Sequence, residues 1–129
     1  MVATRVLLVE DDPGDAHLVC EMLADGDMGT TFQVTVEGSI NAGRERLDQW
    51  EADVIILDLT LPGTSGLRTL EEAQQWANST PIVVMTGLAD EELATAAVGA
   101  GAQDYVIKGR VEPHGLRRTI RHAIERARA

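Results

Sequence analysis

The sequence has 129 residues, which is long enough for one domain with a sizeable core. Its hydrophobic fraction of 44% and charged fraction of 25% are ordinary for a globular protein, and with 3% aromatic residues the core must consist mainly of aliphatic side chains. The formal net charge of −10 argues against a general nucleic-acid binder and against an anionic membrane as a partner, since both need a cationic surface.

Five short apolar segments predict the strands of a sheet. They are mostly β-branched and flanked by turn residues, and they lie at residues 5–9, 32–36, 54–57, 82–85 and 105–107. Near-continuous apolar strands of this kind are typical of a parallel sheet that is covered on both faces.

A helical pattern follows each predicted strand. Asp12 before Pro13 predicts the start of the first helix, and Ser39 and Asp90 can cap the second and fourth. The third lies within residues 66–78, and the last begins near Pro113. We expect their inner faces to be Val19, Met22 and Leu23; Ile40, Leu47 and Trp50; Leu67, Leu70 and Ala77; and Leu116, Ile120, Ile124 and Ala127.

This alternation predicts an open, doubly wound α/β sheet with right-handed crossovers. Ligands of such sheets bind at the carboxyl ends of the strands. The sequence shows no internal repeat and no linker, so we expect residues 1–129 to form a single domain without an output domain.

Polar residues that can carry chemistry stand at these strand ends. Glu10 and Asp11 follow the first strand, Asp58 the third, Thr86 the fourth and Lys108 the fifth. The predicted topology brings all of them to one edge of the sheet. Unit charges about 4 Å apart interact by roughly 4 kcal/mol at an effective dielectric near 20, so neighbouring carboxylates raise each other's pKa or recruit a cation.

A partly open rim of hard oxygen ligands suits Mg²⁺, which binds a few carboxylates and keeps several waters. A central carboxylate such as Asp58 can then attack phosphorus and form an acyl phosphate. In that hypothesis Mg²⁺, Lys108 and the Thr86 hydroxyl hold the phosphoryl oxygens.

Four motifs in this order resemble the receiver domain of two-component response regulators. They are "LLVEDDP" for the acidic pocket, "LDLTLPGTSG" around the phosphoacceptor, "VVMTG" for the switch hydroxyl and "GAQDYVIKG" for the terminal lysine. The resemblance extends along essentially the whole chain. It implies a flavodoxin-like sheet of five parallel strands in the order 2-1-3-4-5, with helices on both faces.

The resemblance also implies roles for individual residues. Asp58 would accept a phosphoryl group from a phosphohistidine of a sensor histidine kinase or a histidine phosphotransfer protein. Asp11 and Asp58 would ligate Mg²⁺ (or Mn²⁺) directly, Glu10 through water, and Thr60 through its backbone carbonyl. The protein would assist its own phosphorylation and dephosphorylation without turning over a metabolite.

The switch in such domains implies roles for Thr86, which would move toward the phosphoryl group, and for Tyr105, which would change rotamer with it. The face of the fourth helix, fifth strand and fifth helix would then bind an output partner or a second copy of the chain. The arginine-rich tail "LRRTIRHAIERARA" is either a solvated helix face or a further partner surface.

Two residues depart from the family pattern. Gly109 follows Lys108 where proline, commonly after a cis peptide bond, is usual. Since a cis bond before a non-proline residue costs about 3 kcal/mol, we expect a trans bond or a rearranged loop here. Gly87 follows Thr86 where a small residue such as alanine is usual, which leaves the site open.

Two other functions remain possible on these residues. One is a Mg²⁺-dependent phosphatase with an aspartyl nucleophile, although Thr60 stands where such enzymes generally have a second acid. The other is a binding module on the same fold that works without phosphorylation, against which the intact set of Glu10, Asp11, Asp58 and Lys108 argues.

The compartment is expected to be the cytoplasm. Cys20 is the only cysteine, which fits a reducing environment, and the apolar run at the start of the chain is too short for a signal peptide. No segment approaches the roughly 18 apolar residues of a membrane span.

Overall fold

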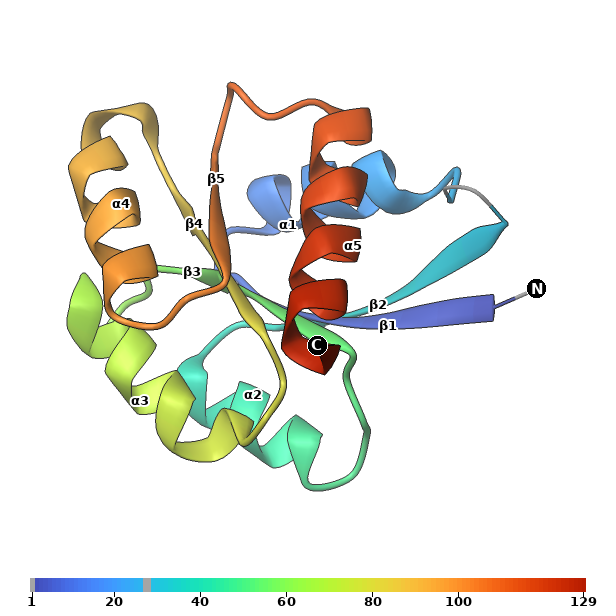
Figure 1. The fold of residues 1–129 in the computed structure, drawn as a ribbon. Coiled ribbons are helices and arrows are strands. Elements are labelled where there is room, and N and C mark those ends of the chain that lie inside the picture. Colours follow the sequence, from blue (N-terminus) through green and yellow to red (C-terminus); the bar gives the residue numbers. More distant parts are fainter. Residues whose placement is uncertain (1, 27–28) are drawn as a thin grey trace.

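Strands and helices alternate along the whole chain in the computed structural model, which describes residues 2–26 and 29–129 (Figure 1). The strands are β1 (Val2–Val9), β2 (Thr30–Glu37), β3 (Val54–Asp58), β4 (Ile82–Thr86) and β5 (Asp104–Ile107). The α-helices are α1 (Pro13–Leu23), α2 (Ile40–Leu47), α3 (Leu67–Ala77), α4 (Glu91–Gly99) and α5 (Pro113–Arg128), and a 3₁₀ turn, η1 (Leu88–Asp90), precedes α4.

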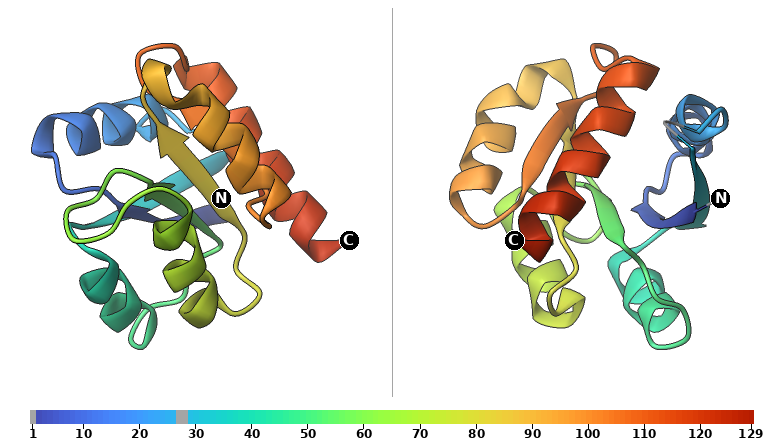
Figure 2. Two further views of the ribbon diagram at one scale, coloured as in Figure 1. Left: turned by 90° about the vertical axis from the view of Figure 1, so that its left-hand side faces the viewer. Right: turned by 45° about the vertical axis from the view of Figure 1, so that its right-hand side comes forward.

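The five strands form one parallel sheet in the order β2-β1-β3-β4-β5. Helices α1 and α5 lie side by side over one face, and α2, α3 and α4 cover the other (Figures 1 and 2). The direction of winding reverses between β1 and β3. This arrangement confirms the predicted doubly wound sheet and its strand order, and it places the carboxyl ends of β1, β3, β4 and β5 at one edge.

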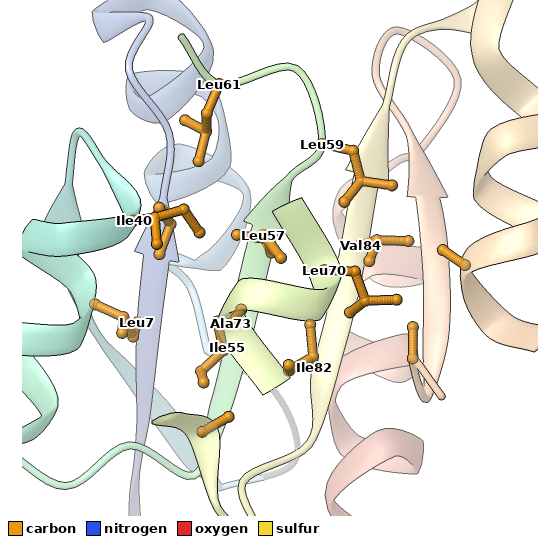
Figure 3. Close-up of a cluster of buried hydrophobic side chains, with 14 residues drawn as sticks. Leu7, Ile40, Ile55, Leu57, Leu59, Leu61, Leu70, Ala73, Ile82 and Val84 are labelled. Atoms are coloured by element: carbon orange, nitrogen blue, oxygen red, sulfur yellow. The ribbon is translucent and has the colours of Figure 1, made fainter. Parts of the chain in front are cut away.

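Two apolar layers hold the helices on the sheet, because successive residues of a strand point to opposite faces. Leu57 of β3 and Val84 of β4 pack under Leu70 of α3 in the first layer, which Figure 3 shows. Ile56 of β3 packs with α1 and α5 in the second. With every residue of β3 and β4 buried, the sheet is a rigid base for the groups at its edge.

The predicted helix starts are largely confirmed. Oδ1 of Asp12 accepts a hydrogen bond from the Gly14 N–H (3.2 Å), and Oγ of Ser39 accepts one from the Ala42 N–H (3.1 Å). Asp90 directly precedes α4, but its side chain makes no capping hydrogen bond, because this residue ends the 3₁₀ turn.

Two predictions for the helix faces were wrong in part or in full. Trp50 packs against the first apolar layer as expected, but it lies beyond α2, because the Asp48 and Gln49 N–H groups bond to carbonyls three residues back and tighten the chain into a turn. Ala127 is exposed, and Ala123, one turn earlier, is buried instead. Arg126 is already level with Gln103, just before β5 begins, so the last turn of α5 projects past the sheet.

In the part of the chain that the structure describes, no helix is long and apolar enough to cross a membrane.

Candidate functional site at the carboxyl edge of the sheet

Three carboxylates meet at the carboxyl ends of β1 and β3. Glu10, Asp11 and Asp58 each offer an oxygen, and these oxygens all lie within 4.8 Å of one another. The parallel register that pairs Val9 with Leu57 brings the three residues together. Glu10 and Asp58 are 2% and 1% exposed, whereas Asp11 is exposed to solvent. The convergence predicted from the strand ends is therefore present.

The two oxygens of Asp58 have different surroundings. Oδ1 accepts hydrogen bonds from the Thr60 backbone N–H (3.0 Å) and the Thr60 hydroxyl (2.8 Å). Oδ2 faces the Lys108 ammonium at 3.2 Å. Burial acts to raise the pKa of Asp58, but hydrogen bonds with Glu10 and Thr60 and the charge of Lys108 outweigh it and lower the pKa. The buried carboxylate is thus ionised at neutral pH.

The same surroundings raise the pKa of Glu10, whereas they lower that of Asp58. Burial is the largest cause that raises its pKa from 4.5 to about 7, and its contact with the Asp58 carboxylate adds to this. Its contact with Lys108 opposes the rise. Two carboxylates side by side in a buried site favour a single negative charge, so a divalent cation would relieve a real electrostatic cost here.

Lys108 connects the acids from the end of β5. Its backbone N–H donates to the Thr86 carbonyl (2.8 Å), which continues the sheet by one residue. Its Nζ lies 2.8 Å from Oε1 of Glu10 and 2.9 Å from Oδ2 of Asp15, besides its contact with Asp58. Burial acts to lower the pKa of Lys108, but these three carboxylates raise it, so the ammonium is charged.

Asp15 was not predicted as part of this site. It stands in the first turn of α1, four residues after Asp11, which is about one helical turn. That spacing was the available signal, because a helix that begins at Asp12 turns Asp15 back toward the edge at which the acids meet. Thr60 was expected to use its backbone carbonyl alone, and its hydroxyl bond to Asp58 is a further contact.

The predicted switch residues lie on the neighbouring strands. Thr86 ends β4 and is fully buried, and its hydroxyl oxygen has no hydrogen-bond partner among the described residues. Tyr105 on β5 is partly buried and packs against the first apolar layer.

The turn after Lys108 differs from the family pattern as expected. The described residues contain no cis peptide bond, so the Lys108–Gly109 bond is trans. Gly109 has a φ of +83°, which glycine adopts readily and other residues do not. At Gly87, a side chain would meet nothing within 4 Å, so the edge beside Thr86 is open.

Part of the arginine-rich end of α5 is tied to the opposite edge of the sheet. Arg126 donates to the Gln103 carbonyl (3.1 Å) and lies 3.4 Å from Asp104, and Arg128 lies 3.5 Å from Asp53. These contacts anchor the helix far from Glu10, Asp11 and Asp58, which together form the acidic cluster.

Comparison with known protein families shows which family this chain belongs to. Residues 6–121 match the model of the response regulator receiver domain. The chain belongs to this family. Receiver domains are the modules of two-component signalling that are phosphorylated on an aspartate, a signalling family rather than one of classical enzymes.

Similar proteins include the regulatory protein VanRB of Enterococcus faecalis, 35% identical over 107 residues, and the cell cycle response regulator CtrA of Brucella ovis, 34% identical over 104 residues. These alignments cover 83% and 81% of this receiver domain but 46% and 43% of the relatives. The chain thus spans less than half the length of these two proteins.

Solved structures show the same fold. Full-length FixJ from B. japonicum superposes with a TM-score of 0.84 at 25% identity, over 98% of this receiver domain and 60% of that chain. A response regulator receiver domain protein from Clostridium thermocellum superposes with a TM-score of 0.80 at 24% identity, over 97% of both chains.

Proposed function

We propose that Asp58 of this receiver domain accepts a phosphoryl group from a phosphohistidine of a sensor histidine kinase or a histidine phosphotransfer protein. The observation that carries the proposal is the asymmetry of its carboxylate. Oδ1 accepts two hydrogen bonds from Thr60, whereas Oδ2 faces the Lys108 ammonium. A buried, ionised carboxylate with one oxygen directed at a cation is suited to a nucleophile.

The transfer would form one bond and break one. Oδ2 of Asp58 would attack phosphorus, an O–P bond would form, and the P–N bond to the donor imidazole would break with its electron pair passing to the ring nitrogen. Lys108 would neutralise charge on the phosphoryl oxygens. In the reverse half of the cycle, water would attack phosphorus and restore the Asp58 carboxylate, with release of inorganic phosphate.

The residues of the acidic cluster fit Mg²⁺ (or Mn²⁺). Asp11 and Asp58 would bind the cation directly, Glu10 through water and Thr60 through its backbone carbonyl. The fit is supported by the hard oxygen donors within 4.8 Å of one another and by the raised pKa of Glu10, which is caused first by burial and then by the neighbouring Asp58 carboxylate. A bound Mg²⁺ would neutralise negative charge on these carboxylates and on the incoming phosphoryl group.

The signal would leave through the face of α4, β5 and α5. The buried Thr86 hydroxyl has no hydrogen-bond partner among the described residues, so it is free to donate a hydrogen bond to a phosphoryl oxygen. Its movement would vacate space that Tyr105 can enter, and the altered face would bind an output partner or a second copy. We infer that residues 1–129 act as one phosphoacceptor domain and that this signalling takes place in the cytoplasm.

The test is incubation with acetyl phosphate and Mg²⁺, followed by intact mass and peptide mapping. We expect one added phosphoryl group on Asp58 and none in the Asp58→Asn variant. A label on another residue, or an unchanged mass, would refute the proposal. Sustained release of phosphate from a small phosphomonoester would instead favour the aspartyl phosphatase, and partner binding unaffected by Asp58→Asn would favour the phosphorylation-independent module.

A further inference from the structure

Among the residues that the structure describes, Asp15 is the one side-chain partner of Lys108 that lies outside the acidic cluster. Its Oδ2 accepts a hydrogen bond from Nζ at 2.9 Å, shorter than the 3.2 Å bond that the same ammonium makes to Asp58. The two residues are 93 positions apart, so the contact ties the first turn of α1 to the end of β5. The Asp15 side chain is 39% exposed and that of Lys108 is 24% exposed.

The other two partners of Lys108 have competing tasks. Glu10 and Asp58 both belong to the group of three carboxylates that can hold a cation, and Asp15 does not. Oδ2 of Asp58 is also the oxygen that would bond to phosphorus. When these two carboxylates turn to a cation and a phosphoryl group, Asp15 is the partner left to hold the ammonium.

Once Glu10 and Asp58 bind other groups, Asp15 is the remaining carboxylate among the described residues that holds the tip of Lys108. The backbone N–H of Lys108 is fixed by its hydrogen bond to the Thr86 carbonyl. The next residue, Gly109, has no side chain, and even a Cβ atom there would contact nothing within 4 Å. A lysine side chain has four rotatable bonds and loses substantial entropy when it is held in one place. An ion pair from the adjacent helix limits this freedom in advance of the transfer.

We propose that Asp15 is a positioning residue that keeps the Lys108 ammonium beside Asp58 while the phosphoryl group is transferred. The inference rests on the proposed function, since it concerns the same transfer. Replacing Asp15 by Asn should slow the phosphorylation of Asp58 about tenfold, which corresponds to about 1.4 kcal/mol. Asp15→Glu, which restores the charge, should recover most of the rate.

The chain offers a direct view of the contact, because Lys108 is its only lysine. Protein labelled with ¹⁵N- and ¹³C-lysine therefore gives side-chain NMR signals from this residue alone. With Mg²⁺ present to draw Glu10 and Asp58 to the cation, we expect a restrained Lys108 side chain in the wild type and a more mobile one in Asp15→Asn, measured by side-chain relaxation without any phosphodonor. A role confined to stabilising the fold would not free this side chain while leaving the folded spectrum intact.

Asp12→Asn is the matched control. It removes the same charge from the start of the same helix, while asparagine caps a helix about as well as aspartate. We expect it to leave both the Lys108 signals and the phosphorylation rate near the wild-type values. A rate loss equal to that of Asp15→Asn would assign the effect to general charge and overturn the proposal.

A double-mutant cycle completes the test. With Lys108→Met already present, Asp15→Asn should cause no further loss of rate, and a full additional loss would overturn the proposal. Unchanged lysine signals in Asp15→Asn, or freed signals with an unchanged rate, would also overturn it. A wild type that takes up no phosphoryl group refutes the proposed function itself, whereas an equally labelled wild type and Asp15→Asn variant refutes the role of Asp15 alone.

Discussion

The Nζ atom of Lys108 lies 3.2 Å from Oδ2 of Asp58, although the two residues are 50 positions apart in the chain. Because Thr60 occupies the other carboxylate oxygen, this contact singles out one atom of Asp58. The same ammonium also contacts Glu10, a second buried carboxyl group, at 2.8 Å. Lys108 therefore contributes to stability as well as to the proposed chemistry, and the two contributions can be measured separately.

Lys108→Met should destabilise the protein in Mg²⁺-free buffer. Removing one partner of a buried ion pair costs about 3–5 kcal/mol, and the partial exposure of Lys108 reduces the expected loss to about 2 kcal/mol. Urea unfolding in EDTA measures it. Asp58→Asn placed in the Lys108→Met background should recover part of the loss, because it removes one of the carboxylates left without a cation. Equal stability of the wild type and Lys108→Met would contradict the ion-pair geometry.

Mg²⁺ should stabilise the wild type, and Asp11→Ala should remove most of the gain. A ligand at ten times its dissociation constant adds about 1.4 kcal/mol to the free energy of unfolding. For a domain of this size that raises Tm by about 5 °C. A Mg²⁺ titration followed by thermal unfolding gives the comparison, with Asp12→Asn as a variant that keeps the response. If the wild type and Asp11→Ala respond equally, the assignment of the metal site is wrong.

The raised pKa of Glu10 predicts how stability depends on pH without Mg²⁺. The folded protein binds a proton at Glu10 up to pH about 7, whereas the unfolded chain releases it near 4.5. The folded state thus holds more protons between these values, and the free energy of unfolding falls as pH rises through them. The drop is on the order of 3 kcal/mol and is complete above pH 7. The lowered pKa of Asp58 and the raised pKa of Lys108 act outside this window.

Denaturant unfolding of the wild type and Glu10→Gln in EDTA at pH 5, 6, 7 and 8 isolates this effect. As pH rises, the free energy of unfolding of Glu10→Gln should increase relative to that of the wild type. Saturating Mg²⁺ should flatten the wild-type profile, because the cation favours the ionised carboxylate. A difference that is constant over this range would mean that Glu10 ionises normally in the folded state.

The sequence predicted the fold and most of the site because parallel strands end at a common edge. Glu10, Asp58, Thr86 and Lys108 each follow an apolar run, and the alternation of strands and helices was enough to bring them together. The trans bond before Gly109 was also predictable, from the cost of a cis bond at a non-proline residue.

The features that the sequence did not predict depend on how helices are oriented and where they end, which the hydrophobic periodicity does not determine. Helical spacing turns Asp15 toward this edge, but its contact with Lys108 also depends on the angle at which α1 leaves β1, which is set by packing. The exposure of Ala127 depends on where the sheet ends beneath α5, and the position of Trp50 depends on a turn that closes α2 early. The first two are tertiary relationships between elements, and the third is a local turn at the end of α2.

Thr86→Val should have opposite effects on the two states of the protein. The Thr86 hydroxyl is buried without a partner among the described residues, and leaving such a group unpaired costs about 1–3 kcal/mol. Valine keeps the branched shape that suits β4, so the unphosphorylated variant should be about 1 kcal/mol more stable than the wild type. The phosphorylated variant lacks a donor to the phosphoryl group, so phosphorylation should stabilise it less than it stabilises the wild type.

Thr86→Ser provides the control, because it keeps the hydroxyl and removes a methyl group from the core. We expect it to lose about 1 kcal/mol in the unphosphorylated state while keeping the response to phosphorylation. Urea unfolding before and after treatment with acetyl phosphate and Mg²⁺ measures both quantities for all three proteins. Valine replaces only the hydroxyl, and serine removes only the methyl group. Comparing the change in stability before and after phosphorylation for the two variants therefore separates the contributions of these two groups. A Thr86→Val variant that loses stability when unphosphorylated would show that the hydroxyl is already paired in that state.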